Sequence, residues 1–76
     1  MTIAQKVKQA IAEQLGKQSN DISEQNSLIG DLKADSLDIV QMLIAMEADF
    51  GIEFQDDEIK TLNTVGDVIA FIENKK

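Results

Sequence analysis

The sequence predicts an all-α protein, a small four-helix bundle with three longer helices, one short helix and a long first loop. Apolar residues recur at helical spacing through most of the 76 residues. Residues that commonly cap or end helices stand at the borders of these segments, and no apolar–polar alternation is long enough for a strand. The length suits one small domain, so we expect residues 1–76 to form a single unit.

The first helix is expected over residues 3–15. Its main apolar positions recur every four residues: Ile3, Val7, Ile11 and Leu15. Thr2 can cap the start of this helix, and Gly16 can end it in a left-handed conformation.

Residues 16–34 are rich in Gly, Ser, Asn and Asp, which predicts a long loop. Four large aliphatic residues are spread through it: Ile22, Leu28, Ile29 and Leu32. We therefore expect this loop to pack against the core. Loops of this length are uncommon in compact domains and are often functional.

The second helix is expected over residues 36–50. Asp35 is a suitable N-cap, Asp38 places a carboxylate near the positive helix end, and Gly51 can end the helix. Apolar residues cover more than one face of this segment. Such a helix is either deeply buried or presents an apolar strip to a partner.

A short helix is expected over residues 56–60, and a last helix follows Thr64. Thr64 and Asp67 have the spacing of a capping box, with Asp in place of the usual Glu or Gln. The apolar face of the last helix consists of Val65, Val68, Ile69 and Ile72.

The net charge of −7 comes from one segment of the chain. Residues 34–59 contain eight acidic residues and no basic one: Asp35, Asp38, Glu47, Asp49, Glu53, Asp56, Asp57 and Glu58. This pattern argues against nucleic-acid binding, which needs clustered basic residues, and favours basic protein partners. The alternative is an acidic surface that serves only solubility.

The composition excludes most chemistry by the chain itself. It has no cysteine and no histidine, so the common nucleophile, general base and metal ligands are missing. No catalytic residue is therefore predicted. The acidic residues do not fit a calcium-binding loop, so no metal site is predicted either. No apolar run could span a membrane and no signal-type core is present, so we expect no membrane insertion and a cytoplasmic location.

Ser36 stands between two aspartates at the start of the second predicted helix. It could simply assist Asp35 as a cap. Alternatively it is a modification site, because a phosphate there would face free N–H groups and the positive end of the helix. Its hydroxyl has no neighbouring base, so another protein would have to activate it.

The segment around this serine resembles a known motif. Residues 31–38, Asp-Leu-Lys-Ala-Asp-Ser-Leu-Asp, closely resemble the D-L-G-A-D-S-L-D motif of acyl carrier proteins. Residues 47–50, 52–54, 56–58 and 64–69 are also similar to family segments, so the resemblance covers residues 3 to 73.

The resemblance implies that Ser36 carries 4′-phosphopantetheine, which a Mg²⁺-dependent phosphopantetheinyl transferase takes from coenzyme A. The thiol of this group would hold acyl chains as thioesters, which makes the chain a carrier in fatty acid biosynthesis and not an enzyme. It also implies partner enzymes, synthases and acyltransferases, with basic patches, and a monomeric carrier.

The resemblance also implies roles in partner binding and in sheltering the acyl chain for two sets of residues. A partner-binding face would comprise Asp35, Leu37, Asp38, Val40, Ile44 and Glu47. We expect the acyl chain to be sheltered by Leu43, Met46, Ile59, Leu62, Val68 and Ile69.

The chain departs from the family pattern at four positions. Lys33 replaces a common glycine, Gln41 and Ala48 stand where acids are frequent, and Gln55 stands where proline is frequent. These departures bear on which partners the chain prefers more than on its function as a carrier. The initial Met and final lysine pair predict a free-standing carrier. The alternatives are a carrier for a polyketide or other specialised pathway, and an acidic helical adaptor with Ser36 unmodified or phosphorylated.

Overall fold

The computed structural model describes residues 2–75, and all four predicted helices are present in it. They are α1 (Ile3–Leu15), α2 (Ser36–Phe50), the short α3 (Asp56–Ile59) and α4 (Val65–Lys75). The first loop contains a 3₁₀ turn, η1 (Ser19–Asp21), which the sequence did not predict. Extended pairing within residues 2–75 is confined to an isolated antiparallel bridge between Ser27 and Thr64.

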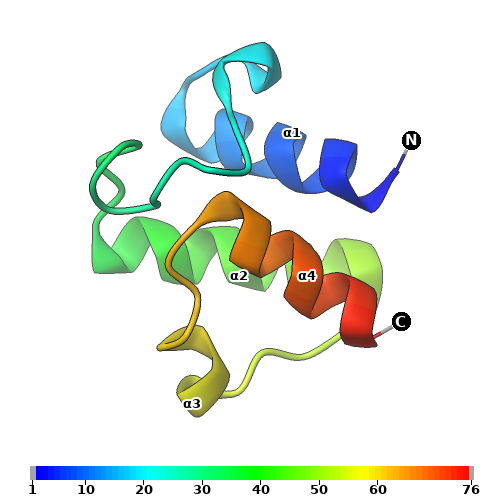
Figure 1. Ribbon diagram of the computed structural model, residues 1–76. Helices are drawn as coiled ribbons and strands as arrows, with labels where there is room; N and C mark the ends of the chain where they lie inside the picture. The colour runs from blue at the N-terminus through cyan, green and yellow to red at the C-terminus, as the bar shows by residue number, and fades with distance from the viewer. Residues whose placement is uncertain (1, 76) are drawn as a thin grey trace.

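Helix α1 packs against both α2 and α4, and α4 crosses in front of α2 in Figure 1. The short α3 lies at the lower edge of the view, within the connection from α2 to α4 (Figure 1). The long first loop crosses to the left side and turns into the start of α2 (Figure 1). None of the helices within residues 2–75 is long and apolar enough to cross a bilayer.

The ends of α1 and α2 follow the predicted capping signals. Thr2 Oγ1 accepts a hydrogen bond from the Gln5 N–H at 3.1 Å, and the Gln5 side chain accepts one from the Thr2 N–H at 3.0 Å. Gly16 and Gly51 end the two helices with φ values of 70° and 68°. A side chain is strained in this left-handed region, so glycine suits both positions.

Helix α4 begins with the predicted capping box. Asp67 Oδ2 accepts hydrogen bonds from the backbone N–H groups of Asn63, at 3.0 Å, and Thr64, at 3.1 Å. Thr64 Oγ1 in turn accepts one from the Asp67 N–H at 3.1 Å. The bonds from Asn63 and Thr64 favour the ionised carboxylate and so lower the pKa of Asp67.

The core is aliphatic and poor in aromatic residues. Its largest fully buried side chains come from the three longer helices and the first loop: Val7, Ile11, Leu28, Met42, Met46, Val65, Val68 and Ile72. Ile22 and Leu32 of the first loop are also buried, as predicted. The prediction was wrong for Ile29, whose side chain is 66% exposed because it lies at the outer side of a tight turn.

Backbone hydrogen bonds join the first loop to the start of α4. The Leu28 N–H donates to Asn63 O at 2.9 Å, the Val65 N–H to Asn26 O at 3.0 Å, and the Gly66 N–H to Glu24 O at 2.8 Å. A Cβ at Gly66 would lie 3.1 Å from Glu24 O, so glycine permits this close approach. These bonds satisfy loop backbone groups and fix the segment that leads to Ser36.

The connection around α3 is held to α4 by side chains. The rings of Phe54 and Phe71 stack with centroids 4.9 Å apart. The Lys75 ammonium lies 3.3 Å from a Glu58 carboxylate oxygen and 5.2 Å from the centre of the Phe71 ring. Of these contacts the stacking is expected to contribute more, since a partly exposed ion pair contributes little.

Candidate functional site

Ser36 is the first residue of α2, and its side chain is exposed. The N-cap is Asp35: its Oδ1 accepts a hydrogen bond from the Asp38 N–H at 2.9 Å. The Asp38 carboxylate completes the box by accepting from the Asp35 N–H at 3.4 Å. The serine takes no part in this cap, and its Oγ makes no hydrogen bond with another residue among 2–75.

Two backbone donors remain open at this helix end. The Asp38 N–H is used by the cap, and the Ile39 N–H donates to Asp35 O at 3.0 Å. The N–H groups of Ser36 and Leu37 have no acceptor within the described part of the chain. Free N–H groups and the helix dipole together favour an anion at this place.

An apolar strip runs along α2 from the serine. Leu37, Val40 and Ile44 are 64%, 41% and 59% exposed, and spacings of three and four residues put them on one helix face. In the same region Asp35 is exposed, and Asp38 and Glu47 are half-buried. Glu47 of the predicted partner face is held in place, because its carboxylate accepts a hydrogen bond from the Phe54 N–H at 2.7 Å.

The residues expected to shelter an acyl chain lie in or beside the core. Leu43, Met46, Leu62, Val68 and Ile69 are buried, and Ile59 is half-buried against them. Two surface pockets on the described residues have volumes of about 460 and 440 Å³, and none of these six residues lines either one.

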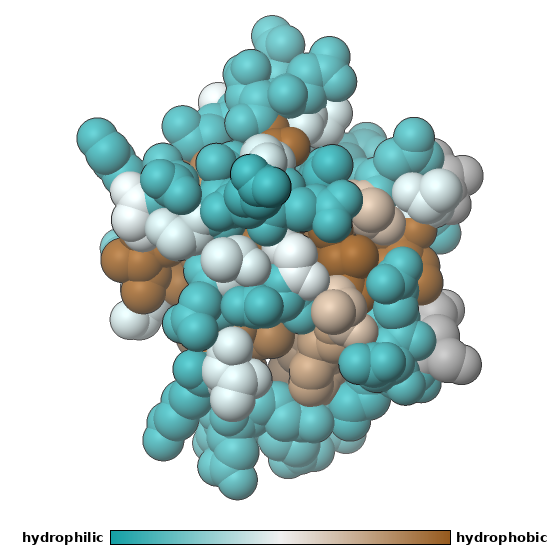
Figure 2. Space-filling model, in the orientation of Figure 1, coloured by the Kyte–Doolittle hydropathy of each residue, from teal (hydrophilic) through white to brown (hydrophobic). Residues whose placement is uncertain are grey.

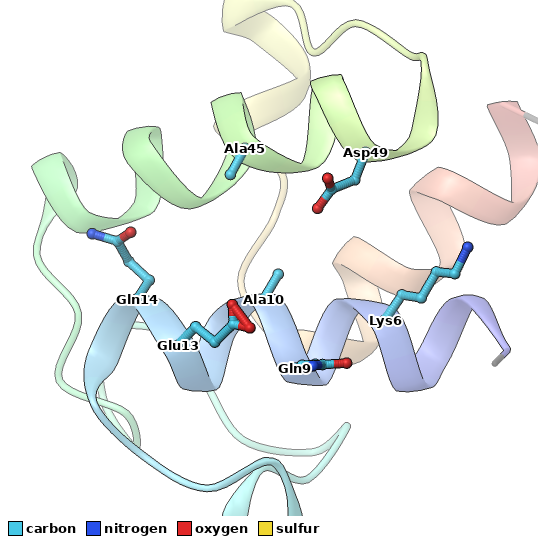
Figure 3. A pocket seen from close by; sticks show the side chains of 7 residues that line it. All are labelled: Lys6, Gln9, Ala10, Glu13, Gln14, Ala45 and Asp49. Carbon is cyan, nitrogen blue, oxygen red and sulfur yellow. The ribbon is translucent and has the colours of Figure 1, made fainter.

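The larger pocket lies between α1 and α2, away from Ser36. Figure 3 shows Gln14 of α1 pointing toward α2, and Asp49 of α2 pointing back toward α1. Gln14 Nε2 also donates a hydrogen bond to Gln41 Oε1 at 2.8 Å. Gln41, which departs from the acidic residues frequent in the resembled family, thus links the two helices.

Lys33 lies three residues before Ser36 and has a φ of 58°. This is the left-handed region, in which a residue with a side chain is less stable than glycine by about 1–2 kcal/mol. The backbone therefore has the turn that glycine would favour here, and the lysine is accommodated under strain.

Comparisons with known proteins agree with this fold and site. Residues 5–72 match the protein family described as phosphopantetheine attachment site. An acyl carrier protein from Solidesulfovibrio magneticus is 41% identical over 76 residues, covering 100% of this chain and 97% of the relative. The solved structure of the thermally stable acyl carrier protein from Enterococcus faecalis aligns with a TM-score of 0.82 and 26% identity, covering 97% of this chain and 94% of that one.

Four helices around an aliphatic core, with an exposed serine at the start of α2, form the arrangement of the carrier domains that this chain matches. The chain belongs to the phosphopantetheine-attachment family, as an acyl carrier protein. The predicted fold and family are confirmed. The chain is a carrier and not an enzyme, its cofactor is 4′-phosphopantetheine, and such carriers work with phosphopantetheinyl transferases and synthase enzymes.

Proposed function

We propose that Ser36 carries the 4′-phosphopantetheine and that the chain thereby shuttles acyl groups between enzymes of fatty acid biosynthesis. The observation that carries the proposal is the exposed, unbonded Ser36 Oγ at the N-terminus of α2. A hydroxyl engaged in capping would have to be released before modification, whereas this one is already free.

The surroundings of Ser36 suit a phosphodiester. Its negative charge would lie beside the open N–H groups of Ser36 and Leu37, at the positive end of a 15-residue helix. No base lies within hydrogen-bonding distance of Ser36 Oγ among residues 2–75, so activation of the hydroxyl falls to the transferase. When bound, the group supplies the thiol that a chain without cysteine lacks.

We assign partner binding to the exposed strip of α2 and the acids beside it. The face comprises Asp35, Leu37, Asp38, Val40, Ile44 and Glu47. Exposed aliphatic side chains next to carboxylates match an enzyme surface that is basic and partly apolar. Asp35 and Asp38 each keep a carboxylate oxygen outside the cap for such contacts.

The acyl chain is assigned to the core beside α2 and α4, among Leu43, Met46, Ile59, Leu62, Val68 and Ile69. Each buried CH₂ group would contribute about 0.8 kcal/mol, offset by the work of separating these side chains. Met46 is unbranched and can adapt to a new neighbour. The family match over residues 5–72 supports a single acyl-carrier domain over residues 1–76.

The attachment is tested by incubating the protein with coenzyme A and a broad-specificity phosphopantetheinyl transferase, followed by intact mass measurement. We expect a gain of one phosphopantetheine, which Ser36→Ala abolishes. Ser19→Ala, a change at another exposed serine, should leave the gain intact. Folded wild-type protein without the gain would contradict the proposal, and a simple phosphate on Ser36 of native protein would favour a phosphorylation switch.

The pathway is tested separately with the loaded protein. Purified fatty-acid-synthesis enzymes should elongate acyl chains on it faster than polyketide enzymes do. The reverse order would leave the carrier role intact and assign the chain to a specialised pathway.

A further inference from the structure

Ile29 is the most exposed large apolar side chain within residues 2–75, at 66%. The other three such side chains, Leu37, Val40 and Ile44, all belong to α2. Ile29 lies in the first loop, outside the partner-binding face assigned above. A single exposed aliphatic side chain is ordinary on a protein surface, so Ile29 is distinguished by how it is held and by its place beside the approach to Ser36.

The turn beneath Ile29 holds this side chain in place. The Ser27 N–H donates to Asp31 Oδ2 at 2.8 Å, and the Asp31 N–H donates to Ser27 Oγ at 2.9 Å. The Leu32 N–H closes the turn on Ser27 O at 3.0 Å. Leu28 and Leu32 are buried on either side, so the turn is anchored to the core and Ile29 would lose little freedom on binding.

The same turn is tied to the approach to Ser36. The Ala34 N–H donates to Leu28 O at 2.9 Å. This bond holds Leu28, which precedes Ile29, beside Ala34, which lies two residues before Ser36. Figure 2 shows apolar surface at the left edge, where the first loop meets the start of α2 in Figure 1. The exposed large apolar residues of these two segments are Ile29 and Leu37.

We propose that Ile29 is a docking contact for the phosphopantetheinyl transferase, separate from the strip on α2; this rests on the proposed modification of Ser36. The transferase must bring its catalytic groups to Ser36 Oγ itself and therefore covers the surface around it. Enzymes that act on acyl groups also bind the α2 face, but they react at the far end of the attached arm and so do not need a contact with the first loop as well.

Charge selects this occupant over a second copy of the chain. Asp31 lies in the turn and Asp35 follows it, with Lys33 as the one basic residue between them, and no basic residue then follows until Lys60. Two copies, each with a net charge of −7, repel one another. The surface that fits is an apolar hollow bordered by basic side chains.

The test is the steady-state rate of transfer from coenzyme A to the full-length unmodified protein. Ile29→Ser should raise KM by about five- to thirty-fold, the range of an interface residue that matters, with kcat unchanged. Ile29→Leu keeps the apolar contact and should behave as wild type. Gln18→Ser, at an exposed position elsewhere in the same loop, should leave KM unchanged.

A second variant loosens the turn while keeping Ile29. A Cβ at Gly30 would lie 2.6 Å from Ser27 Oγ, so Gly30→Ala should break the bond from the Asp31 N–H and raise KM by a smaller factor than Ile29→Ser. Urea unfolding of every variant checks that it is folded. If Ile29→Ser unfolds at a lower urea concentration than wild type, Ile29→Thr is used in its place.

A wild-type KM for folded Ile29→Ser would overturn the proposal. A wild-type dimer in sedimentation, lost in Ile29→Ser without a change in KM, would also overturn it and assign the contact to a second copy. Failure of the wild-type protein to accept phosphopantetheine is a different result, because it removes the proposed modification of Ser36 itself.

Discussion

Asp35 and Asp38 cap the start of α2 reciprocally, each carboxylate accepting a hydrogen bond from the other residue's N–H. The bond to the Asp38 N–H, at 2.9 Å, is short, and the bond to the Asp35 N–H, at 3.4 Å, is long. Both aspartates therefore have a structural role besides any contact with partners. The two roles can be separated because capping needs an acceptor oxygen, whereas attraction of a basic enzyme needs charge.

Asp38→Asn keeps an acceptor oxygen and removes the charge. We expect its free energy of unfolding to stay within about 0.5 kcal/mol of wild type. Asp38→Lys should slow phosphopantetheine transfer more than Asp38→Asn does, and the loss should be larger at low salt, where charges are less screened. Transfer rates at two ionic strengths measure this, and equal rates for all three proteins would argue against partner recognition by Asp38.

Asp35→Ala removes the cap of α2. We expect a loss of about 0.5–2 kcal/mol in the free energy of unfolding in urea, as for other N-caps. Asp35→Asn, which can still accept the bond from the Asp38 N–H, serves as the control and should lose much less. Equal losses for the two variants would show that charge, not the hydrogen bond, makes the cap.

Lys33→Gly should stabilise the protein, because φ at this position is 58°. Removing the side chain relieves about 1 kcal/mol of left-handed strain, reduced by the greater freedom of glycine in the unfolded chain. The reverse change at Gly16, Gly16→Ala, meets a φ of 70° and should destabilise by about 1 kcal/mol. Urea midpoints give both signs, and a less stable Lys33→Gly would mean that the lysine makes a stabilising contact in solution.

Stability should fall in acid partly through Asp67. Its pKa is lowered in the folded state, so the folded protein binds the proton less readily than the unfolded chain. The stabilisation is therefore complete above the unfolded value, about pH 4, and is lost as pH falls through the lower folded value. The difference in unfolding free energy between wild type and Asp67→Asn should shrink from pH 7 to pH 3; a constant difference would contradict this linkage.

The helices could be predicted because their signals are local. Thr2 and Gly16 mark the ends of α1, and Asp35 and Gly51 mark those of α2, within a few residues of the groups that they satisfy. The surplus of apolar residues on α2 predicted either deep burial or an exposed apolar strip, and Leu37, Val40 and Ile44 are exposed.

The loops could not be predicted in the same way because their partners are distant. Nothing near Leu28 in the sequence indicates that its N–H donates to Asn63 O. Aliphatic content alone suggested that Ile29 was buried, although the spacing of Ser27, Gly30 and Asp31 carried the signal of a tight turn. The stacking of Phe54 on Phe71 likewise depends on the tertiary fold.

The backbone bonds between the first loop and the start of α4 close the chain into a ring that contains Ser36, α2 and α3. Separation of the first loop from α4 breaks these N–H···O bonds together, while α2 stays packed against α1. Native-state hydrogen exchange should therefore give similar protection factors for the amides of Leu28, Val65 and Gly66. Through the Ala34 to Leu28 bond, the ring also ties the backbone just before the attachment serine to the last helix.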